Sequence, residues 1–159
     1  RLVPFLHQEN LVSAASFDEL LPREKEILTA AAPLIQTRVQ VLSEAVGMLG
    51  FLFVLDDQVE LQEDALKSLK DGALDVLNEA IAKLSQLSSE EFTVSVMEPL
   101  LRQAIVEDMG VKPRLAFGPL RVGVTGRRVS PPLFESMEIL GKASSLTRLE
   151  GLRKHLMQS

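Results

Sequence analysis

Hydrophobic residues recur every three or four positions along two long segments of the chain. In residues 71–87, leucine or isoleucine occupies positions 74, 77, 81, 84 and 87; in residues 145–157, leucine occupies positions 146, 149, 152 and 156. Because an α-helix has about 3.6 residues per turn, this spacing places the apolar side chains along one face of a helix. The pattern predicts an all-α chain with many short helices, in which Asp71 caps the first of these two segments.

Prolines and capping residues divide the first half of the chain into smaller predicted elements. Residues 16–19 (Ser-Phe-Asp-Glu) have the spacing of a capping box, and Pro22 stands where a helix can begin. Pro33 is expected in the first turn of the next helix, where the missing N–H costs least. The apolar run 50–55 is compatible with a strand, a helix or a loop at this length.

Serine and glycine frame the predicted helices of the second half. Ser95 has cap spacing with the glutamate three residues later, and the helix that follows is expected to stop at Gly110. Residues 115–124 form another short apolar element. Ser130 precedes two prolines, so it is expected to cap a helix over residues 133–140 that ends at the next glycine.

The composition narrows the class of protein. Hydrophobic residues make up 46% of the 159 positions, which is enough for a core, and the scarcity of aromatic residues favours helices over strands. The sequence has no cysteine. This excludes disulfides, cysteine zinc sites, iron–sulfur clusters and thiol catalysis, and it fits a cytoplasmic protein. No apolar run reaches the roughly 18 residues of a membrane span.

The length fits one domain or two small ones. The chain begins at Arg1 within an apolar pattern, and we expect it to be the C-terminal piece of a longer protein.

Charge is distributed unevenly along the chain. Residues 110–159 carry nine Lys or Arg against three Glu, whereas residues 1–109 carry eight Lys or Arg against nineteen Asp or Glu. A concentration of positive charge on one segment indicates an oppositely charged partner even when the net charge is negative. The phosphate backbone of a nucleic acid is the commonest partner of this kind.

The basic segment contains a candidate binding site for phosphates and unstacked bases. Its cations surround a turn rich in Gly, Pro, Thr and Ser and precede the predicted helix start; they are Lys112, Arg114, Arg121, Arg127 and Arg128. Backbone donors, a helix N-terminus and arginine side chains together suit phosphate groups and exposed bases. Solubilising surface charge remains the alternative for each cation alone. Phe117 and Phe134 could stack on bases, but their spacing favours a place in the core.

Other candidate sites are weaker. The acidic run 56–64 lacks the ligand spacing of a calcium loop and is interpreted as a solvated linker. His7 and His155 are the only histidines and lie at opposite ends, so no catalytic Ser-His-Asp arrangement can be argued. Gly141-Lys142 does not complete a phosphate-binding loop, because Ser136 and Ala143 stand where that motif requires Gly and Ser or Thr.

Several stretches of the basic segment resemble the end of bacterial-type glutamyl-tRNA synthetases. The similar residues are Phe117-Gly-Pro-Leu-Arg-Val-Gly-Val-Thr-Gly126, Ser130-Pro-Pro-Leu-Phe-Glu135, Ile139-Leu-Gly141 and Arg148-Leu149. The resemblance extends less sharply to Pro33-Leu-Ile-Gln-Thr-Arg38 and residues 71–109. It therefore covers the whole chain, as the anticodon-binding region of that family. It implies an all-α cage of two helical subdomains, for which we expect residues 1–62 and 63–159.

The resemblance also implies roles for individual residues. Arg121 would contact an anticodon base, and Ser130, Pro131 and Leu133 would line the pocket for the second and third bases. Arg38 is the candidate for reading the first base from the first subdomain. Lys112, Arg114, Arg127 and Arg128 are expected to contact phosphate. Gly118 replaces a larger polar residue that is common in the family, so one contact is expected to be missing.

The catalytic motifs of that family are absent from the sequence. Neither a His-x-Gly-His-type element nor a Lys-Leu/Met-Ser-Lys loop occurs. The segment alone is therefore expected to need no cofactor, whereas the parent enzyme would use ATP and magnesium. The expected partners are the tRNA for glutamate, with the glutamine tRNA left open, and the catalytic domain of the same chain, in a monomer with no membrane contact. The alternative is a helical protein–protein adaptor with an acidic contact surface.

Overall fold

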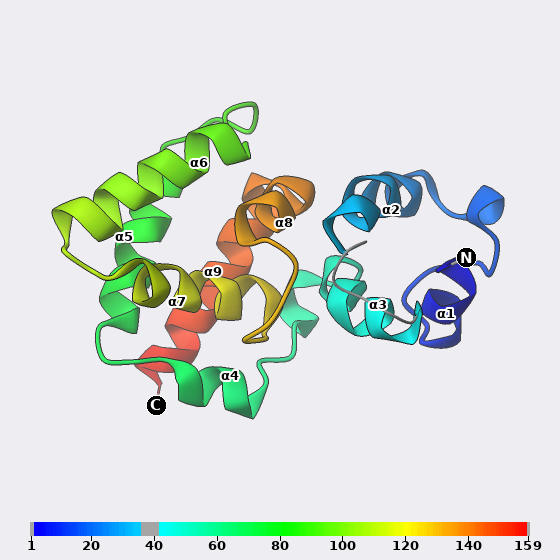
Figure 1. Cartoon of the computed structure of the whole chain (residues 1–159), viewed down its shortest axis with the longest axis horizontal. Helices are drawn as coiled ribbons and strands as arrows, with labels where there is room; N and C mark the ends of the chain where they lie inside the picture. The colour runs from blue at the N-terminus through cyan, green and yellow to red at the C-terminus, as the bar shows by residue number, and fades with distance from the viewer. Residues whose placement is uncertain (1, 36–41, 159) are drawn as a thin grey trace.

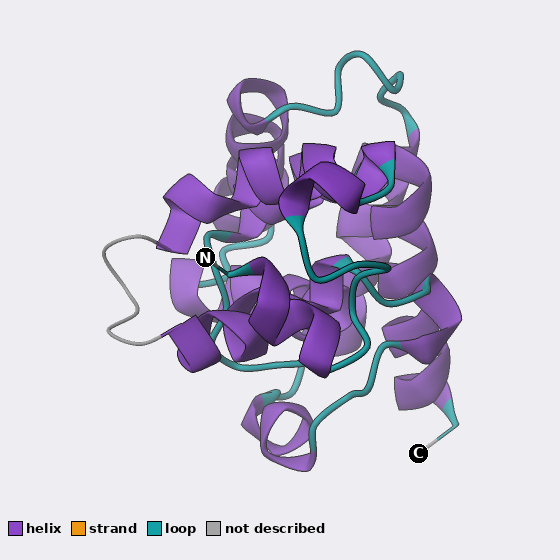
Figure 2. Cartoon of the chain, turned by 90° about the vertical axis from the view of Figure 1, so that its right-hand side faces the viewer, coloured by secondary structure: helices purple, strands orange, loops and turns teal. Residues whose placement is uncertain are grey.

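The computed structural model describes residues 2–35 and 42–158, and in these ranges the chain is helical, with no strand (Figures 1 and 2). The α-helices are α1 (Val3–Gln8), α2 (Pro22–Ile35), α3 (Leu42–Leu49), α4 (Glu63–Ser68), α5 (Ala73–Ser85), α6 (Val94–Leu101), α7 (Pro113–Thr125), α8 (Leu133–Leu140) and α9 (Lys142–Met157). Short 3₁₀ turns cover Phe17–Glu19, Gly50–Leu52 and Asp56–Gln58, and a π-helical segment, Arg102–Asp108, continues α6. The predicted all-α fold is confirmed.

Helix α9 is the centre of the larger group of helices. Helices α1–α3 lie on one side of the molecule and α4–α9 on the other (Figure 1). Within the second group, α9 packs against α5, α7 and α8. Helix α7 approaches α9 closely at Gly123, where a Cβ would lie 3.0 Å from the Leu149 side chain. The absence of a side chain at that position is thus what allows the two helices to pack so tightly.

Two hydrophobic clusters hold the helices together. The larger runs from Ile27 in α2 to Leu152 in α9, and the smaller joins α1 and the start of α2 through residues such as Leu6 and Leu28. The larger cluster contains residues from both sides of position 62. Hydrophobic burial alone therefore does not define a boundary there, and the division into residues 1–62 and 63–159 stays a prediction.

The proline and glycine predictions had mixed outcomes. Helix α2 begins at Pro22, as predicted, but Pro33 lies in its last turn rather than at the start of a new helix. Pro33 is exposed, so water can hydrogen-bond to the carbonyl that its missing N–H leaves without a helical partner. Gly141 ends α8, as predicted, and Gly126 (φ 75°) ends α7, because at both positions the chain turns into a conformation that favours glycine.

The predicted helix caps were largely wrong. Helix α5 is preceded by Gly72, with φ 94°, so the chain enters the helix one residue after Asp71 and no side chain caps it. Helix α6 has Thr93 rather than Ser95 at its N-cap. Helix α8 follows Pro132, and the hydroxyl of Ser130 is used elsewhere. The capping-box spacing at 16–19 corresponds only to a 3₁₀ turn without a side-chain cap bond.

The acidic run 56–64, interpreted as a solvated linker, is one only in part: four of its five acidic side chains are exposed, but both of its ends have helical structure. It begins with a 3₁₀ turn, and its last two residues start α4. Asp56 forms an ion pair with Arg148 of α9, at 2.7 Å between Oδ1 and Nε. The apolar run 50–55 opens with a buried 3₁₀ turn that includes Phe51 and Leu52. In the ranges that the structure describes, no helix is long and apolar enough to cross a bilayer.

Candidate nucleic-acid interface

Helix α7 presents a polar stripe on the side away from the core. Pro113 occupies its first turn, and Leu120, Val122 and Val124 are buried. Arg114, Gly118 and Arg121 follow at intervals of four and three residues, which places them along one face of the helix. Gly118 has no neighbour within 4 Å of where a Cβ would stand. The stripe is therefore two arginines separated by an open position.

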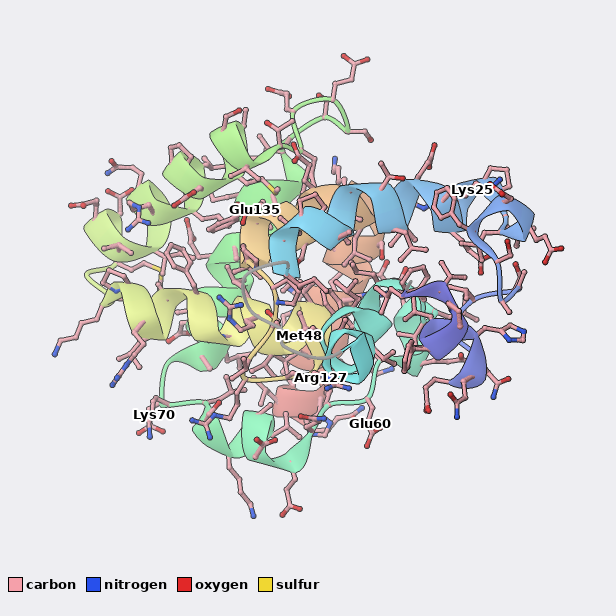
Figure 3. The ribbon with its side chains drawn as sticks, turned by 45° about the vertical axis from the view of Figure 1, so that its right-hand side comes forward. Lys25, Met48, Glu60, Lys70, Arg127 and Glu135 are labelled. Carbon is pink, nitrogen blue, oxygen red and sulfur yellow. The ribbon has the colours of Figure 1, made fainter. Side chains whose placement is uncertain are left out.

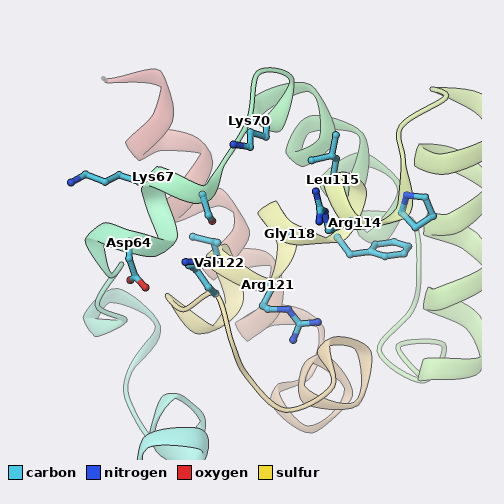
Figure 4. Close-up of a pocket in the computed structure, with 12 residues that line it drawn as sticks. Asp64, Lys67, Lys70, Arg114, Leu115, Gly118, Arg121 and Val122 are labelled. Carbon is cyan, nitrogen blue, oxygen red and sulfur yellow. The ribbon is translucent and has the colours of Figure 1, made fainter.

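This stripe forms one wall of a groove, and helix α4 forms the other (Figure 4). We call this cavity of about 920 Å³ the α4–α7 groove. Its charged lining residues are Asp64, Lys67, Lys70, Arg114, Arg121 and Arg128. Five cations and one carboxylate meet here, although the chain as a whole carries a net charge of −5. The fold thus concentrates positive charge at a concave surface, as polyanion binding requires.

Arg121 is held in place by the loop that follows α7. One Nη donates to the Ser130 hydroxyl at 2.6 Å and to the Pro131 carbonyl at 3.1 Å. The Ser130 side chain is 3% exposed, so this bond lies inside the protein. A guanidinium with several fixed donors on a groove wall is suited to directional recognition of a planar acceptor group.

The same loop is tied to the end of α7 by Thr125. Its hydroxyl donates to the Arg121 carbonyl at 2.8 Å and accepts from the Arg127 N–H at 3.0 Å. Gly126 follows, and a Cβ at this position would collide with the carbonyl oxygen of Glu60. The Gly126 carbonyl also accepts a hydrogen bond of 2.9 Å from the N–H of Gln62. The segment before α4 and the end of α7 are thus joined directly, which fixes the two walls of the groove.

Arg127 and Arg128 separate at this turn. Arg128 is exposed and lines the α4–α7 groove. Arg127 is half-buried and lines another cavity of about 360 Å³, together with Gly47 of α3 and the carboxylates Glu9 and Glu60. Figure 3 shows Arg127 and Glu60 on the same side of the molecule. Two neighbouring cations that the sequence analysis treated alike therefore lie in different electrostatic surroundings.

The other predicted residues are placed as follows. Lys112 lines a smaller cavity of about 380 Å³ beside the groove, which Arg114 also lines. Pro131 and Leu133 are buried, and neither lines the α4–α7 groove in this conformation. Arg38 lies outside the described residues.

Two lysines of the groove were missed by the sequence analysis. Lys67 and Lys70 belong to an acidic stretch, and nothing in their local pattern points to binding. Lys70 lies two residues beyond the end of α4, so the two lysines share no helix face, and only the packing of this segment opposite α7 brings both to the groove. Lys67 also pairs with Glu63 of the same helix at 2.7 Å.

Phe117 and Phe134 pack on each other, as the core interpretation expects. Their rings meet edge to face with centroids 5.3 Å apart, and Phe134 is buried. The guanidinium carbon of Arg102 lies 5.5 Å from the centre of the Phe117 ring. Phe134 therefore supports α7 and α8 from within, as expected, whereas Phe117 is half-buried and lines the α4–α7 groove.

A buried arginine supports the groove from behind. Arg148 of α9 is 3% exposed and, besides Asp56, bonds the carbonyls of Phe51, Val54 and Val124 at 2.8 to 3.0 Å. It therefore connects the segment after α3 to the last turn of α7. All four acceptors are satisfied by one rigid, planar group, which lysine could not match.

The titratable groups with displaced pKa values lie away from the groove. Burial would raise the pKa of Glu24, but hydrogen bonds from the Ser13 hydroxyl and from the Leu21 and Ser13 N–H groups lower it overall. Hydrogen bonds from Ser88 lower the pKa of Glu91. Within the described ranges, no cluster of three or more His, Asp or Glu side chains could hold a metal ion.

Comparison with curated proteins finds close relatives among glutamate–tRNA ligases. The chain is 53% identical over 156 residues to the glutamate–tRNA ligase of Bifidobacterium longum and, over the same length, to that of Kocuria rhizophila. These matches cover 98% of this chain but only 31% and 30% of the relatives. The chain therefore spans about a third of the length of the proteins it matches.

Comparison with solved structures also finds a glutamate tRNA ligase. A glutamate tRNA ligase from Elizabethkingia meningosepticum, solved in complex with its amino acid, superposes with a TM-score of 0.60 over 96% of this chain and 32% of that one. The sequence identity is 17%, so this likeness concerns the fold. These comparisons give no support to the alternative of a helical protein–protein adaptor. A family model described as an anticodon binding domain matches residues 2–153, and the chain therefore belongs to the anticodon binding domain family of glutamate–tRNA ligases and their relatives.

Proposed function

We propose that this chain recognises the anticodon loop of the tRNA for glutamate as part of a glutamate–tRNA ligase. The ATP- and magnesium-dependent joining of glutamate to tRNA would be carried out by a catalytic region outside this chain. The names of the relatives and the anticodon-binding family support the proposal. The observation that carries it is the basic α4–α7 groove with Arg121 fixed on its wall.

Within this proposal, Arg121 contacts a base. Its hydrogen bonds to Ser130 and Pro131 orient the guanidinium before RNA arrives, so less entropy is lost on forming a directional contact. Ser130, Pro131 and Leu133 then determine the shape of the base pocket, Ser130 and Pro131 through Arg121 and Leu133 through its buried place at the start of α8. A role for Arg38 in reading a base from the first subdomain stays a prediction.

Phosphate contacts are assigned to the exposed cations. Lys112, Arg114 and Arg128 lie in or beside the groove and can meet a bending RNA strand as point charges. Arg127 was predicted to do the same, but its half-buried position near Glu9 and Glu60 favours a structural role. The proposal therefore gives phosphate binding mainly to the other three.

The experiment is binding of anticodon stem-loops to wild type and Arg121→Ala across a salt series. One RNA carries the cognate anticodon of glutamate tRNA, and others carry single substitutions at each anticodon base. Arg121→Ala is expected to lose about 1–3 kcal/mol on the cognate loop and to discriminate less among the substituted ones. Arg153→Ala is the matched control, because Arg153 is a partly exposed arginine of α9 that lines neither cavity of the interface.

If Arg121→Ala weakens the binding of cognate and substituted loops equally, Arg121 does not read a base. Absence of salt-dependent RNA binding by wild type would refute the proposal as a whole. The same RNA series made with the glutamine anticodon tests whether that tRNA is also bound. We also propose that the protein is a monomer and acts in the cytoplasm. The sedimentation coefficient of the chain tests whether it is a monomer.

A further inference from the structure

We infer that helix α4 and the two residues after it form a second RNA-binding wall, on which Lys67 of the helix and Lys70 beyond its end bind the phosphates of the strand whose bases face α7. This inference rests on the proposed function and extends it to a helix that the basic segment does not include. Both lysines line the groove that Arg114 and Arg121 line from α7. In Figure 4 the Lys67 side chain points outward from α4, so its flexible ammonium group would turn toward a bound strand. A single-stranded loop in a groove has its bases on one side and its backbone on the other, so opposite walls meet different groups.

The charges on the two walls differ in a way that fits this division. Arg121 on α7 is held by internal hydrogen bonds and can make directional contacts. Lys67 and Lys70 are exposed and carry flexible ammonium groups, which bind phosphate as point charges without a required orientation. Among the described residues, no acidic side chain lies within ion-pair distance of Lys70.

Lys67 is available for phosphate despite its ion pair with Glu63. Both side chains are largely exposed, 73% for Lys67 and 81% for Glu63. An exposed pair of this kind contributes about 0–1 kcal/mol, so a phosphate can displace the carboxylate at low cost. Asp64, the one acidic residue that lines the groove, precedes both lysines and would keep the RNA backbone toward the end of α4 and the residues after it.

The position of α4 makes the inference specific to this fold. The Gln62 N–H donates to the Gly126 carbonyl directly before the helix begins, and Gly126 leaves no room for a side chain against Glu60. Helix α4 is therefore attached to the turn that also carries Arg128. RNA contact at α7 and at the turn would bring the backbone past Lys67 and Lys70 without any movement of the chain.

The test is the salt dependence of stem-loop binding by the double variant Lys67→Gln with Lys70→Gln. Each contact with a single-stranded phosphate contributes about 0.7 to the slope of log K against log salt. The double variant is therefore expected to lower the slope by about 1.4 and, at 0.1 M salt, the affinity by about 25-fold. The loss is expected to be equal for cognate and substituted loops, in contrast to Arg121→Ala.

The matched control is Lys83→Gln with Lys142→Gln, which removes the same charge from residues that do not line the groove. The charge-preserving pair Lys67→Arg with Lys70→Arg is expected to restore the wild-type slope. Circular dichroism and thermal melting check that each variant is folded.

If wild type binds RNA with a salt-dependent affinity but the Lys67/Lys70 double variant has the slope of the control, the inference fails and the proposed function stands. The inference also fails if the slope falls and the arginine pair does not restore it. If wild type shows no salt-dependent binding, both the inference and the proposed function fall.

Discussion

Replacing Arg148 by methionine is expected to destabilise the fold without altering any residue of the groove. Methionine has a similar length and can remain buried beside α7, but it offers no donor. The change leaves the carbonyls of Phe51, Val54 and Val124 without their partner and breaks the ion pair with Asp56. Asp56 stays one third exposed, so most of the loss comes from the carbonyls that lose their donor, at about 1–3 kcal/mol each. Because such terms do not add in full, we expect a total of about 3–5 kcal/mol.

Thermal and urea unfolding, followed by circular dichroism at 222 nm (about the helix minimum), measure this loss. For a chain of 159 residues, 1 kcal/mol corresponds to about 2–4 °C, so the Tm is expected to fall by about 6–20 °C. Arg148→Lys should lose less stability than Arg148→Met, because lysine keeps the positive charge. It should still be less stable than wild type, because lysine cannot satisfy all four acceptors.

Arg153→Met is the control on the same helix. Arg153 makes one weak contact with Asn78, at 3.4 Å, so its replacement is expected to change the free energy of unfolding by less than about 0.5 kcal/mol. If Arg148→Met loses less than about 1 kcal/mol, the argument that this arginine connects the segment after α3 to α7 is wrong.

Two further predictions concern the turn after α7 and the pH dependence of stability. Gly126→Ala is expected to lower the free energy of unfolding by more than the roughly 1–2 kcal/mol that a left-handed alanine costs, because its Cβ would also collide with the Glu60 carbonyl. Urea unfolding measures this loss, and a value under about 1 kcal/mol would contradict the prediction. The lowered pKa of Glu24 means that its ionised form is stabilised by folding, so the contribution is complete above the ordinary value of 4.5 and is lost as pH falls through the lower folded-state pKa. Ser13→Ala should therefore destabilise the chain at neutral pH and have less effect in acid, which unfolding at both pH values checks; an equal loss at both would exclude the linkage.

Periodic apolar positions predicted the long helices well. Segments 71–87 and 145–157 became α5 and α9, although α9 starts three residues earlier, at Lys142. The position of a helix with a continuous apolar face can be predicted from the spacing of its apolar residues, because that face is buried whatever the helix packs against. Cap assignments failed more often. A serine hydroxyl bonds whichever partner the fold brings near, and for Ser130 that partner is Arg121 rather than a helix N–H.

The sequence by itself determined the helical class, the main helices and the concentration of cations in residues 110–159. These properties follow from local spacing and from residue type. Only the tertiary structure decided which cations act together. It placed Lys67 and Lys70 of an acidic segment opposite Arg121, and it turned Arg127 away from Arg128 toward another cavity. Electrostatic partners are selected by distance in space, and the distance between α4 and α7 depends on packing contacts that no local pattern encodes.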